Sequence, residues 1–142
     1  MHELKVSNCK LIPSESHHNA TGQLFVFENL KTIPFEIKRV YSIRNVLHNV
    51  TRGKHAHTLL KQVVICLSGS CKFLLDDGTN REIVELDNPG IGLYIGTYVW
   101  REMFDFSEDC ILMVLASEFY DANEYIRNYE DFLKITKNDP LL

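Results

Sequence analysis

Residues 62–86 read QVVICLSGSCKFLLDDGTNREIVEL, and this stretch decides the fold. It holds three short apolar segments, separated by Ser68-Gly69-Ser70 and by Asp76-Asp77-Gly78-Thr79. Turns rich in Gly and Asp between apolar segments are typical of antiparallel hairpins. The stretch therefore predicts an antiparallel sheet. Many strands of this length in one chain favour a sandwich or a small barrel.

The same pattern continues on both sides of this stretch. Short apolar or alternating segments predict further strands at residues 4–11, 23–27, 35–43, 92–95, 99–104 and 110–116. The polar residues 13–21 between the first two of these segments predict a loop. His17 and His18 belong to that loop, so we expect both side chains to be solvated.

The pattern changes near the C-terminus. Apolar residues there recur at the spacing of an amphipathic helix: Tyr125, Ile126, Tyr129, Phe132 and Leu133. We therefore predict one all-β domain over residues 1–142, with strands between about residues 4 and 117 and a packed C-terminal amphipathic helix at about residues 121–135.

The composition excludes several classes of protein. The chain has 142 residues, of which 45% are hydrophobic and 24% charged, as in a soluble globular domain. Its net charge is -4 and its basic residues are scattered, which argues against nucleic-acid binding but leaves room for local cations around an anionic small molecule. With no long apolar run or signal segment, we expect a cytoplasmic protein. The four cysteines lack C-x-x-C spacing and predict reduced, packed thiols.

A pair of histidines precedes the central stretch. Residues 52–57 read RGKHAH, and on an extended strand His55 and His57 project to the same side. Two imidazoles that converge in this way can bind a metal ion or exchange protons with a substrate. The spacing alone also allows an incidental pair without function.

Two further candidates share one face of the strand predicted at residues 35–43. Arg39 and Tyr41 alternate there with apolar residues that face the core. An arginine on such a face needs an anion, which is either a ligand or a structural carboxylate. The tyrosine is either a packed ring or a hydroxyl aimed into a cavity. The pattern leaves both alternatives open.

The residues around the histidine pair distinguish metal binding from proton transfer. Metal-binding cupins often place a carboxylate four or five residues after His-x-His and another histidine on a later strand. Here Gln62 stands at the place of the carboxylate, and residues 96–102 contain no histidine. Because a neutral amide is a weak ligand, we favour proton transfer and expect neither a metal ion nor another cofactor.

Several segments together resemble the sugar nucleotide 3,4-ketoisomerases of the cupin superfamily. These segments are KRVY (38–41), RGKHAH (52–57), QVVICLSGS (62–70), LDDG (75–78), LYIG (93–96), WREM (100–103), LAS (115–117), YD (120–121) and YIRNY (125–129). The resemblance implies a jelly-roll barrel and a homodimer, in which strands can be exchanged between subunits. It also implies metal-independent isomerisation of dTDP-4-keto-6-deoxy-D-glucose to the 3-keto sugar, which an aminotransferase then converts to a 3-amino-3,6-dideoxyhexose for surface polysaccharide such as O-antigen.

The resemblance also implies roles for individual residues. His55 and His57 are the catalytic pair, without a decision on which of them takes the C3 proton, and either the protonated neighbouring imidazole or Tyr41 supplies a proton to the enediolate. The substrate-binding residues are expected to be Arg39 and Arg52 at the diphosphate, Trp100 against the base or sugar, and Gln62 and Arg101.

Arg101 marks a departure from the family pattern, which has a histidine directly after the tryptophan. The arginine either changes reprotonation at C4 or binds phosphate, so the C4 configuration of the product stays open. Three other functions remain: a 3,5-epimerase-like sugar-nucleotide cupin, a non-catalytic sugar-binding cupin and a metal-dependent cupin.

Overall fold

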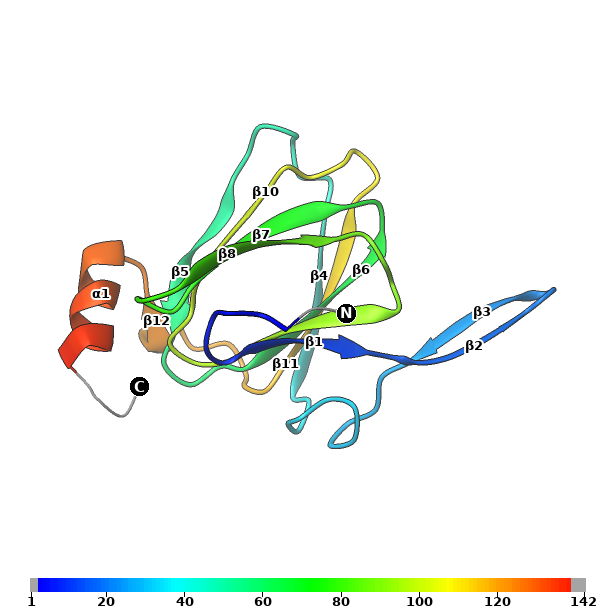
Figure 1. The fold of residues 1–142 in the computed structure, drawn as a ribbon, viewed down its shortest axis with the longest axis horizontal. Helices are drawn as coiled ribbons and strands as arrows, with labels where there is room; N and C mark the ends of the chain where they lie inside the picture. Colours follow the sequence, from blue (N-terminus) through cyan, green and yellow to red (C-terminus); the bar gives the residue numbers. More distant parts are fainter. Residues whose placement is uncertain (1–2, 139–142) are drawn as a thin grey trace.

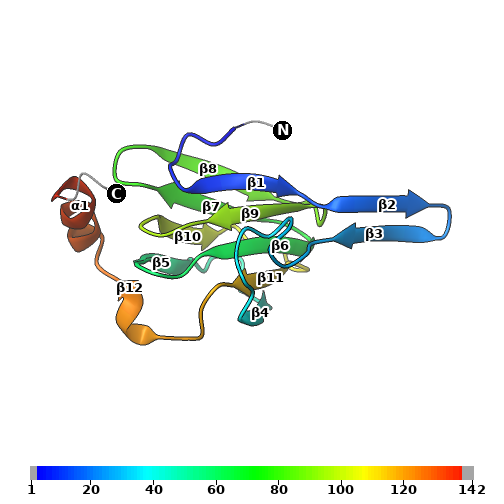
Figure 2. The same cartoon turned by 90° about the horizontal axis from the view of Figure 1, so that it is seen from below.

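The computed structural model describes residues 3–138, and two five-stranded sheets face each other in it (Figures 1 and 2). The first sheet has the order β1 (Cys9–Pro13), β9 (Ile91–Ile95), β6 (Gln62–Ser68), β11 (Ile111–Ala116) and β4 (Arg39–Arg44). The second has the order β12 (Tyr125–Ile126), β5 (Arg52–His57), β10 (Trp100–Phe104), β7 (Cys71–Asp76) and β8 (Arg81–Leu86). All strand pairs within them are antiparallel, as predicted.

The main core fills the space between the two sheets. Its fully buried side chains include Phe73 and Leu75 from the second sheet and Leu93 and Leu112 from the first. Cys66, Cys71 and Cys110 belong to the same cluster as free thiols, and burial raises the pKa of each. These three cysteines are therefore packed, unreactive core residues, as the sequence predicted.

The two turns of residues 62–86 have the geometry that their residues predict. Gly69 adopts φ +67°, and a Cβ at this position would collide with the side chains of Ser107 and Asp109. In the β7–β8 turn, Asp77 Oδ1 accepts hydrogen bonds from the backbone N–H groups of Thr79 (2.8 Å) and Asn80 (2.7 Å). The second turn joins the paired strands β7 and β8 of the second sheet. The turn at Gly69 instead carries the chain from β6 in the first sheet to β7 in the second, so these two strands do not form a hairpin.

The predicted loop at residues 13–21 is wrong in part. Residues Glu15–Asn19 form β2, which pairs with β3 (Gly22–Val26) in a separate two-stranded sheet. This hairpin projects away from the barrel (Figures 1 and 2). Asn19 closes its turn by accepting a hydrogen bond from Thr21 N at 2.8 Å. The polar composition of β2 hid the strand, because it has no buried face and hence no alternation of apolar residues.

The C-terminal helix begins later than predicted. Helix α1 spans Tyr129–Asn138, whereas the preceding residues form the 3₁₀ helix η1 (Ala122–Glu124) and the strand β12. Asp121 caps η1 through a hydrogen bond from Asn123 N, and β12 pairs with β5. The apolar spacing of Tyr125 and Ile126 therefore reflects strand pairing and not a helical turn.

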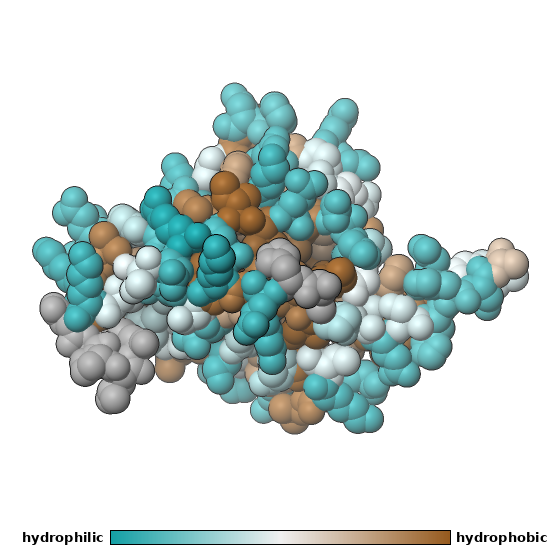
Figure 3. Space-filling view, in the orientation of Figure 1, coloured by the Kyte–Doolittle hydropathy of each residue, from teal (hydrophilic) through white to brown (hydrophobic). Residues whose placement is uncertain are grey.

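Helix α1 lies at one end of the sandwich, where it packs against β5 and β12 of the second sheet (Figures 1 and 2). Phe132 is fully buried in a cluster with Ala56, Trp100 and Ile126. The Tyr129 hydroxyl donates a hydrogen bond to the buried carboxylate of Asp76 at 2.5 Å. Among residues 3–138, no helix is long and apolar enough to cross a membrane. On the face shown in Figure 3, polar side chains surround smaller hydrophobic patches.

Replacement of Phe132 tests how firmly the helix is anchored. We expect Phe132→Ala to lower the free energy of unfolding by about 3–5 kcal/mol, because a fully buried ring leaves a cavity. Ile135→Ala is the matched control, since Ile135 lies on the same helix and is 37% exposed. Urea denaturation measures both variants. Equal losses would contradict the anchoring role of Phe132.

Candidate active site

Both histidines of the pair lie on the inner face of β5. Their ring centroids are 4.7 Å apart, with an angle of 82° between the ring planes. Ala56 between them faces the opposite way, into the cluster beneath α1. His57 is buried, and β5 is held on one side by β10 and on the other by β12. The predicted convergence of the two imidazoles is thus present in the structure.

The Nδ1 atom of each ring contacts an oxygen atom that only accepts hydrogen bonds. His55 Nδ1 lies 3.0 Å from the carbonyl oxygen of Gly53, and His57 Nδ1 lies 2.7 Å from Glu124 Oε1. When the rings are neutral, Nδ1 therefore carries the proton and Nε2 is a free acceptor. Among residues 3–138, the buried Nε2 of His57 has no hydrogen-bond partner.

The surroundings keep both imidazoles neutral. Burial and the nearby Arg101 guanidinium lower the pKa of His55 to about 4. Burial, followed by Arg101 and the other ring, lowers the pKa of His57 further. At neutral pH both rings thus hold the form that accepts a proton.

Three predicted site residues form one hydrogen-bonded chain inside the barrel. Gln62 Nε2 donates to the Tyr41 hydroxyl at 2.7 Å, and Gln62 Oε1 accepts a hydrogen bond from the guanidinium of Arg101. Since the tyrosine oxygen accepts from Gln62, its own proton is available to another acceptor. Burial raises the pKa of Tyr41, so the phenol keeps its proton at neutral pH.

Arg101 is the most deeply buried charge of the site. Its relative exposure is 2%, and its Nε and one terminal nitrogen both donate to the carbonyl of Val99. Burial lowers its pKa to about 10, so the guanidinium remains charged at neutral pH. It stands directly opposite His55 in the β5–β10 pairing and faces the same side.

Arg39 contributes a second cation at the same end of the barrel. Its guanidinium lies over the rings of Tyr41 (5.3 Å) and Tyr120 (5.8 Å), and its Nε is buried without a partner among the described residues. An unpartnered guanidinium N–H at a site edge is suited to a phosphate oxygen.

Arg52 lies farther from the histidines. A bulge at Lys54, which has φ 59°, shifts the β5–β10 register so that Arg52 faces Met103 on the inner side. Four residues lie between it and His57 on the strand, which places the two Cα atoms about 15 Å apart at the usual rise per residue. A ligand that contacts both residues must therefore span about this length.

Trp100 is not brought to the histidine pair within this chain. Its ring lies on the opposite face of β10, 5.2 Å from Tyr129 and 5.9 Å from Phe132, and its indole N–H donates to Glu102 at 2.9 Å. These contacts give it a packing role beneath helix α1.

The sequence analysis missed a group of site residues at the start of the C-terminal segment. The Tyr125 ring lies 4.9 Å from His55 and 4.4 Å from His57, and the Arg127 guanidinium lies 4.2 Å from the centre of that ring. Glu124 is buried beside His57. We expected a helix at about residues 121–135, which would not place these residues beside β5. They reach the histidines through the β5–β12 pairing, and no local sequence pattern predicts that pairing.

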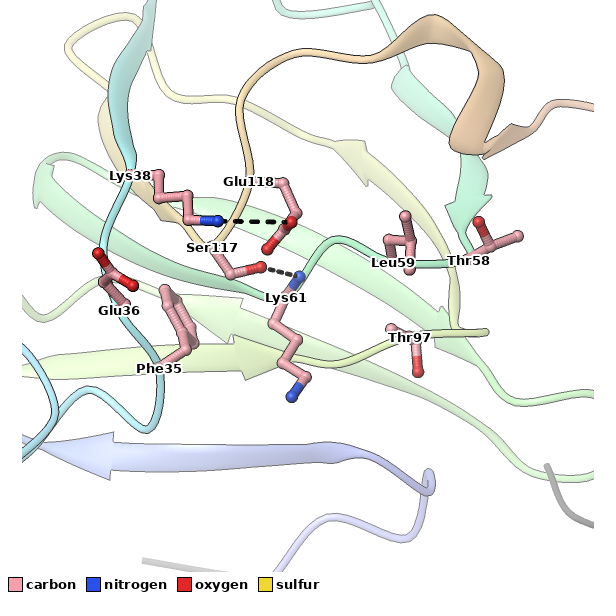
Figure 4. A pocket seen from close by; sticks show the side chains of 9 residues that line it. All are labelled: Phe35, Glu36, Lys38, Thr58, Leu59, Lys61, Thr97, Ser117 and Glu118. Carbon is pink, nitrogen blue, oxygen red and sulfur yellow. Dashed lines mark hydrogen bonds and ion pairs between the residues drawn. The ribbon is translucent and has the colours of Figure 1, made fainter.

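A surface hollow of about 370 Å³ opens beside the end of β5 (Figure 4). Thr58 and Leu59 line one side, and Lys38 and Glu118, which form an ion pair of 3.9 Å, lie on the other side with Lys61 between. The histidine rings do not line this hollow, so the site inside the barrel is distinct from it.

The donor set fits a metal ion poorly. Among residues 3–138, no group of three or more His, Cys, Asp and Glu side chains is arranged to hold one. The positive charges of Arg101, Arg39 and Arg127 all act on His57, and they oppose a divalent cation. The same charges favour an anionic substrate.

Fold and site together define a cupin with a His-x-His motif inside the barrel. The family model described as "FdtA: WxcM-like, C-terminal" matches residues 7–137. The chain is 49% identical over 132 residues to the TDP-4-oxo-6-deoxy-alpha-D-glucose-3,4-oxoisomerase of Aneurinibacillus thermoaerophilus, which covers 93% of this chain and 91% of that enzyme.

Solved structures agree with this match. A variant of the 3,4-ketoisomerase QdtA from Thermoanaerobacterium thermosaccharolyticum, in complex with TDP-4-keto-6-deoxyglucose, has a TM-score of 0.92 at 47% identity, covering 96% of this chain and 99% of that one. The TDP-quinovose 3,4-ketoisomerase WlaRB from Campylobacter jejuni has a TM-score of 0.87 at 51% identity, covering 91% and 99%. The chain belongs to this family of cupin-type sugar nucleotide 3,4-ketoisomerases.

The lowered pKa of His55 predicts a loss of stability in acid. The unfolded chain takes up a proton near the ordinary value of 6.5, whereas the folded ring does so only near 4. Stability from the neutral ring is therefore complete above about pH 6.5 and is lost as the pH falls towards about 4.

Urea denaturation of a His55→Gln variant at several pH values tests this. The fall in unfolding free energy between pH 7 and pH 4.5 should be smaller than in the unaltered protein. His48→Gln, a change at an 83% exposed side chain, should leave the fall unchanged. If His55→Gln gave the same slope as the unaltered protein, the assigned shift would be wrong.

Proposed function

We propose that this protein isomerises TDP-4-keto-6-deoxyglucose to the corresponding 3-keto sugar without a metal ion or other cofactor. The observation that carries this proposal is the pair of neutral, inward-facing imidazoles, each with a free Nε2, beside the phenol of Tyr41. The similarity to two enzymes whose names state this reaction or substrate supports it.

The reaction moves a carbonyl by proton transfer alone. One imidazole removes the proton from C3, and a donor protonates the C4 carbonyl oxygen, which gives an enediol. The C3 hydroxyl then loses its proton while C4 receives one, so the carbonyl stands at C3 and no electrons leave the sugar. His55 and His57 carry the proton transfers and Tyr41 is the donor to the oxygen. Each acid or base step contributes about 10²- to 10⁴-fold.

The cationic side chains of the site bind and orient the substrate. Arg39 and Arg52 bind the diphosphate, since a guanidinium matches phosphate geometry. Gln62 and Arg101 bind on the sugar side, where their chain of hydrogen bonds orients Tyr41. Trp100 supports the site from beneath, through β10, and not by stacking on the substrate.

The chemistry of the product indicates the pathway in which the protein acts. A 3-keto sugar nucleotide is the substrate of an aminotransferase, so we place this protein in the cytoplasm on the way to a 3-amino-3,6-dideoxyhexose for surface polysaccharide such as O-antigen. A 3,5-epimerase-like reaction is the second candidate, because it also needs a histidine base and starts from the same 4-keto sugar.

We also propose that two chains form a homodimer through the β2–β3 hairpin, with this hairpin exchanged between subunits. An isolated two-stranded hairpin is marginal in water, yet this one extends away from the barrel (Figure 2). It also exposes Leu24, which is 56% accessible. A second copy of the chain would cover this apolar surface and complete the pairing.

The reaction is tested by NMR in deuterated water with a chelator present. We expect the 4-keto sugar to be converted to a 3-keto sugar that carries deuterium at C4, and the coupling between H5 and its neighbour in a proton-containing sample reports the C4 configuration. His57→Asn should lose about 10²- to 10⁴-fold in rate, as expected for a lost acid or base. His48→Asn is the matched control and should stay active. Deuterium at C3 or C5 with the 4-keto group retained would instead show an epimerase.

The dimer is tested by light scattering during gel filtration. The unaltered chain should elute with twice its mass of 16.5 kDa. Leu24→Asp should shift the protein towards the monomer, because a charge is then buried at the contact. Leu47→Asp, at a 71% exposed position elsewhere, should not. A monomeric unaltered chain would refute the proposal.

A further inference from the structure

The two histidines of the site differ in what holds their Nδ1 atoms. The partner of His55 is a neutral backbone carbonyl, at 3.0 Å from Gly53. The partner of His57 is the carboxylate of Glu124, whose two oxygens lie 2.7 and 3.0 Å from Nδ1. Only one ring of the pair therefore has a carboxyl group at Nδ1, and burial raises the pKa of that group above its ordinary value.

That carboxylate selects one tautomer of His57. A carboxylate accepts hydrogen bonds, so it favours the ring with its proton on Nδ1 and opposes the one with a lone pair there. The other nitrogen, Nε2, is buried and has no partner among residues 3–138. Glu124 thereby leaves the inward-facing nitrogen as a bare proton acceptor.

Glu124 is itself fixed to the strand that carries the histidine. Its backbone carbonyl accepts hydrogen bonds from Thr58 N at 3.0 Å and Thr58 Oγ1 at 3.3 Å, and its Oε2 accepts from Thr58 N at 3.2 Å. Thr58 directly follows His57, and Tyr125, directly after Glu124, pairs with His57 in the β5–β12 ladder. Ring and carboxylate are therefore held together from both sides.

We propose that Glu124 is a positioning residue for the isomerisation, which keeps His57 Nε2 free and stabilises the ring after it has taken a proton. This role rests on the proposed function. When a proton moves from a sugar carbon to Nε2, Nδ1 keeps its own proton and the ring becomes positive. The carboxylate balances that charge against the guanidinium of Arg101, which opposes it.

The experiment uses two substitutions of the full chain. Glu124→Gln keeps the shape and an oxygen that accepts from Nδ1–H, but removes the charge. We expect it to lower kcat by about 10- to 100-fold with KM changed by less than about twofold, by analogy with the carboxylates that orient metal-ligating histidines. Glu130→Gln is the matched control, because it makes the same change on the exposed surface of α1 and should keep full activity.

The second substitution, Glu124→Leu, removes the acceptor and is followed by ¹⁵N NMR of labelled histidine without substrate. The unaltered protein should show His57 protonated at Nδ1, and the variant should show a shift towards protonation at Nε2. A folded Glu124→Gln variant with kcat equal to that of Glu130→Gln would overturn the proposal. So would an unaltered His57 that carries its proton on Nε2.

The isomerisation and the positioning role of Glu124 can be refuted separately. If the unaltered protein forms no 3-keto sugar, the proposed reaction is wrong, whereas the tautomer measured without substrate still decides whether Glu124 controls His57. If the reaction occurs and the tautomer does not depend on Glu124, only the positioning role is wrong.

Discussion

A charged guanidinium buried inside the barrel is the constraint on which the site depends. Arg101 has almost no contact with water, and each of its three side-chain nitrogens donates a hydrogen bond, to the carbonyl of Val99 or to the amide oxygen of Gln62. These bonds turn the Gln62 amide towards Tyr41, and the charge helps to keep both imidazoles neutral. A buried charge with neutral partners is costly, so the surrounding structure must hold it firmly. The position between β5 and β7 provides that support, because both neighbouring strands pair with β10.

The site is assembled from strands that are distant in the chain. Arg39 comes from β4, Gln62 from β6 and Arg101 from β10, while the C-terminal segment adds Glu124 and Tyr125. In the jelly roll these strands meet because the two sheets face each other across one core. The helix α1 closes this end, since its buried Phe132 packs behind β5 and β10. Strands β5 and β10 thus carry the buried cluster around Phe132 on one face and the site residues on the other. A change that loosens this cluster therefore also affects the geometry of the site.

The features that the sequence predicted correctly depend on the alternation of side chains along a single strand. The features that it missed depend on pairing between segments that are distant in the chain. His55 and His57 share a face because strand side chains alternate, and the turn residues around Asp77 join the paired strands β7 and β8. The hairpin strand β2 has no buried face, so no alternation marks it. Glu124 reaches His57 across 67 residues, which no local pattern predicts. Trp100 was assigned to the substrate by resemblance, yet on its strand it faces the opposite way from Arg101.

The positive charge of Arg101 has two opposite effects on a proton transfer, because it weakens the base and stabilises the anion that forms. Arg101 makes each imidazole a weaker base, because the protonated ring would stand beside another cation. In the isomerisation that we propose, the same charge stabilises the negative oxygen that develops when the C3 proton leaves, so the weaker base faces a more acidic carbon. A carboxylate next to only one of the rings breaks this symmetry, since it offsets the cation at His57 and not at His55. Two chemically identical side chains thereby become different acids within 5 Å of each other.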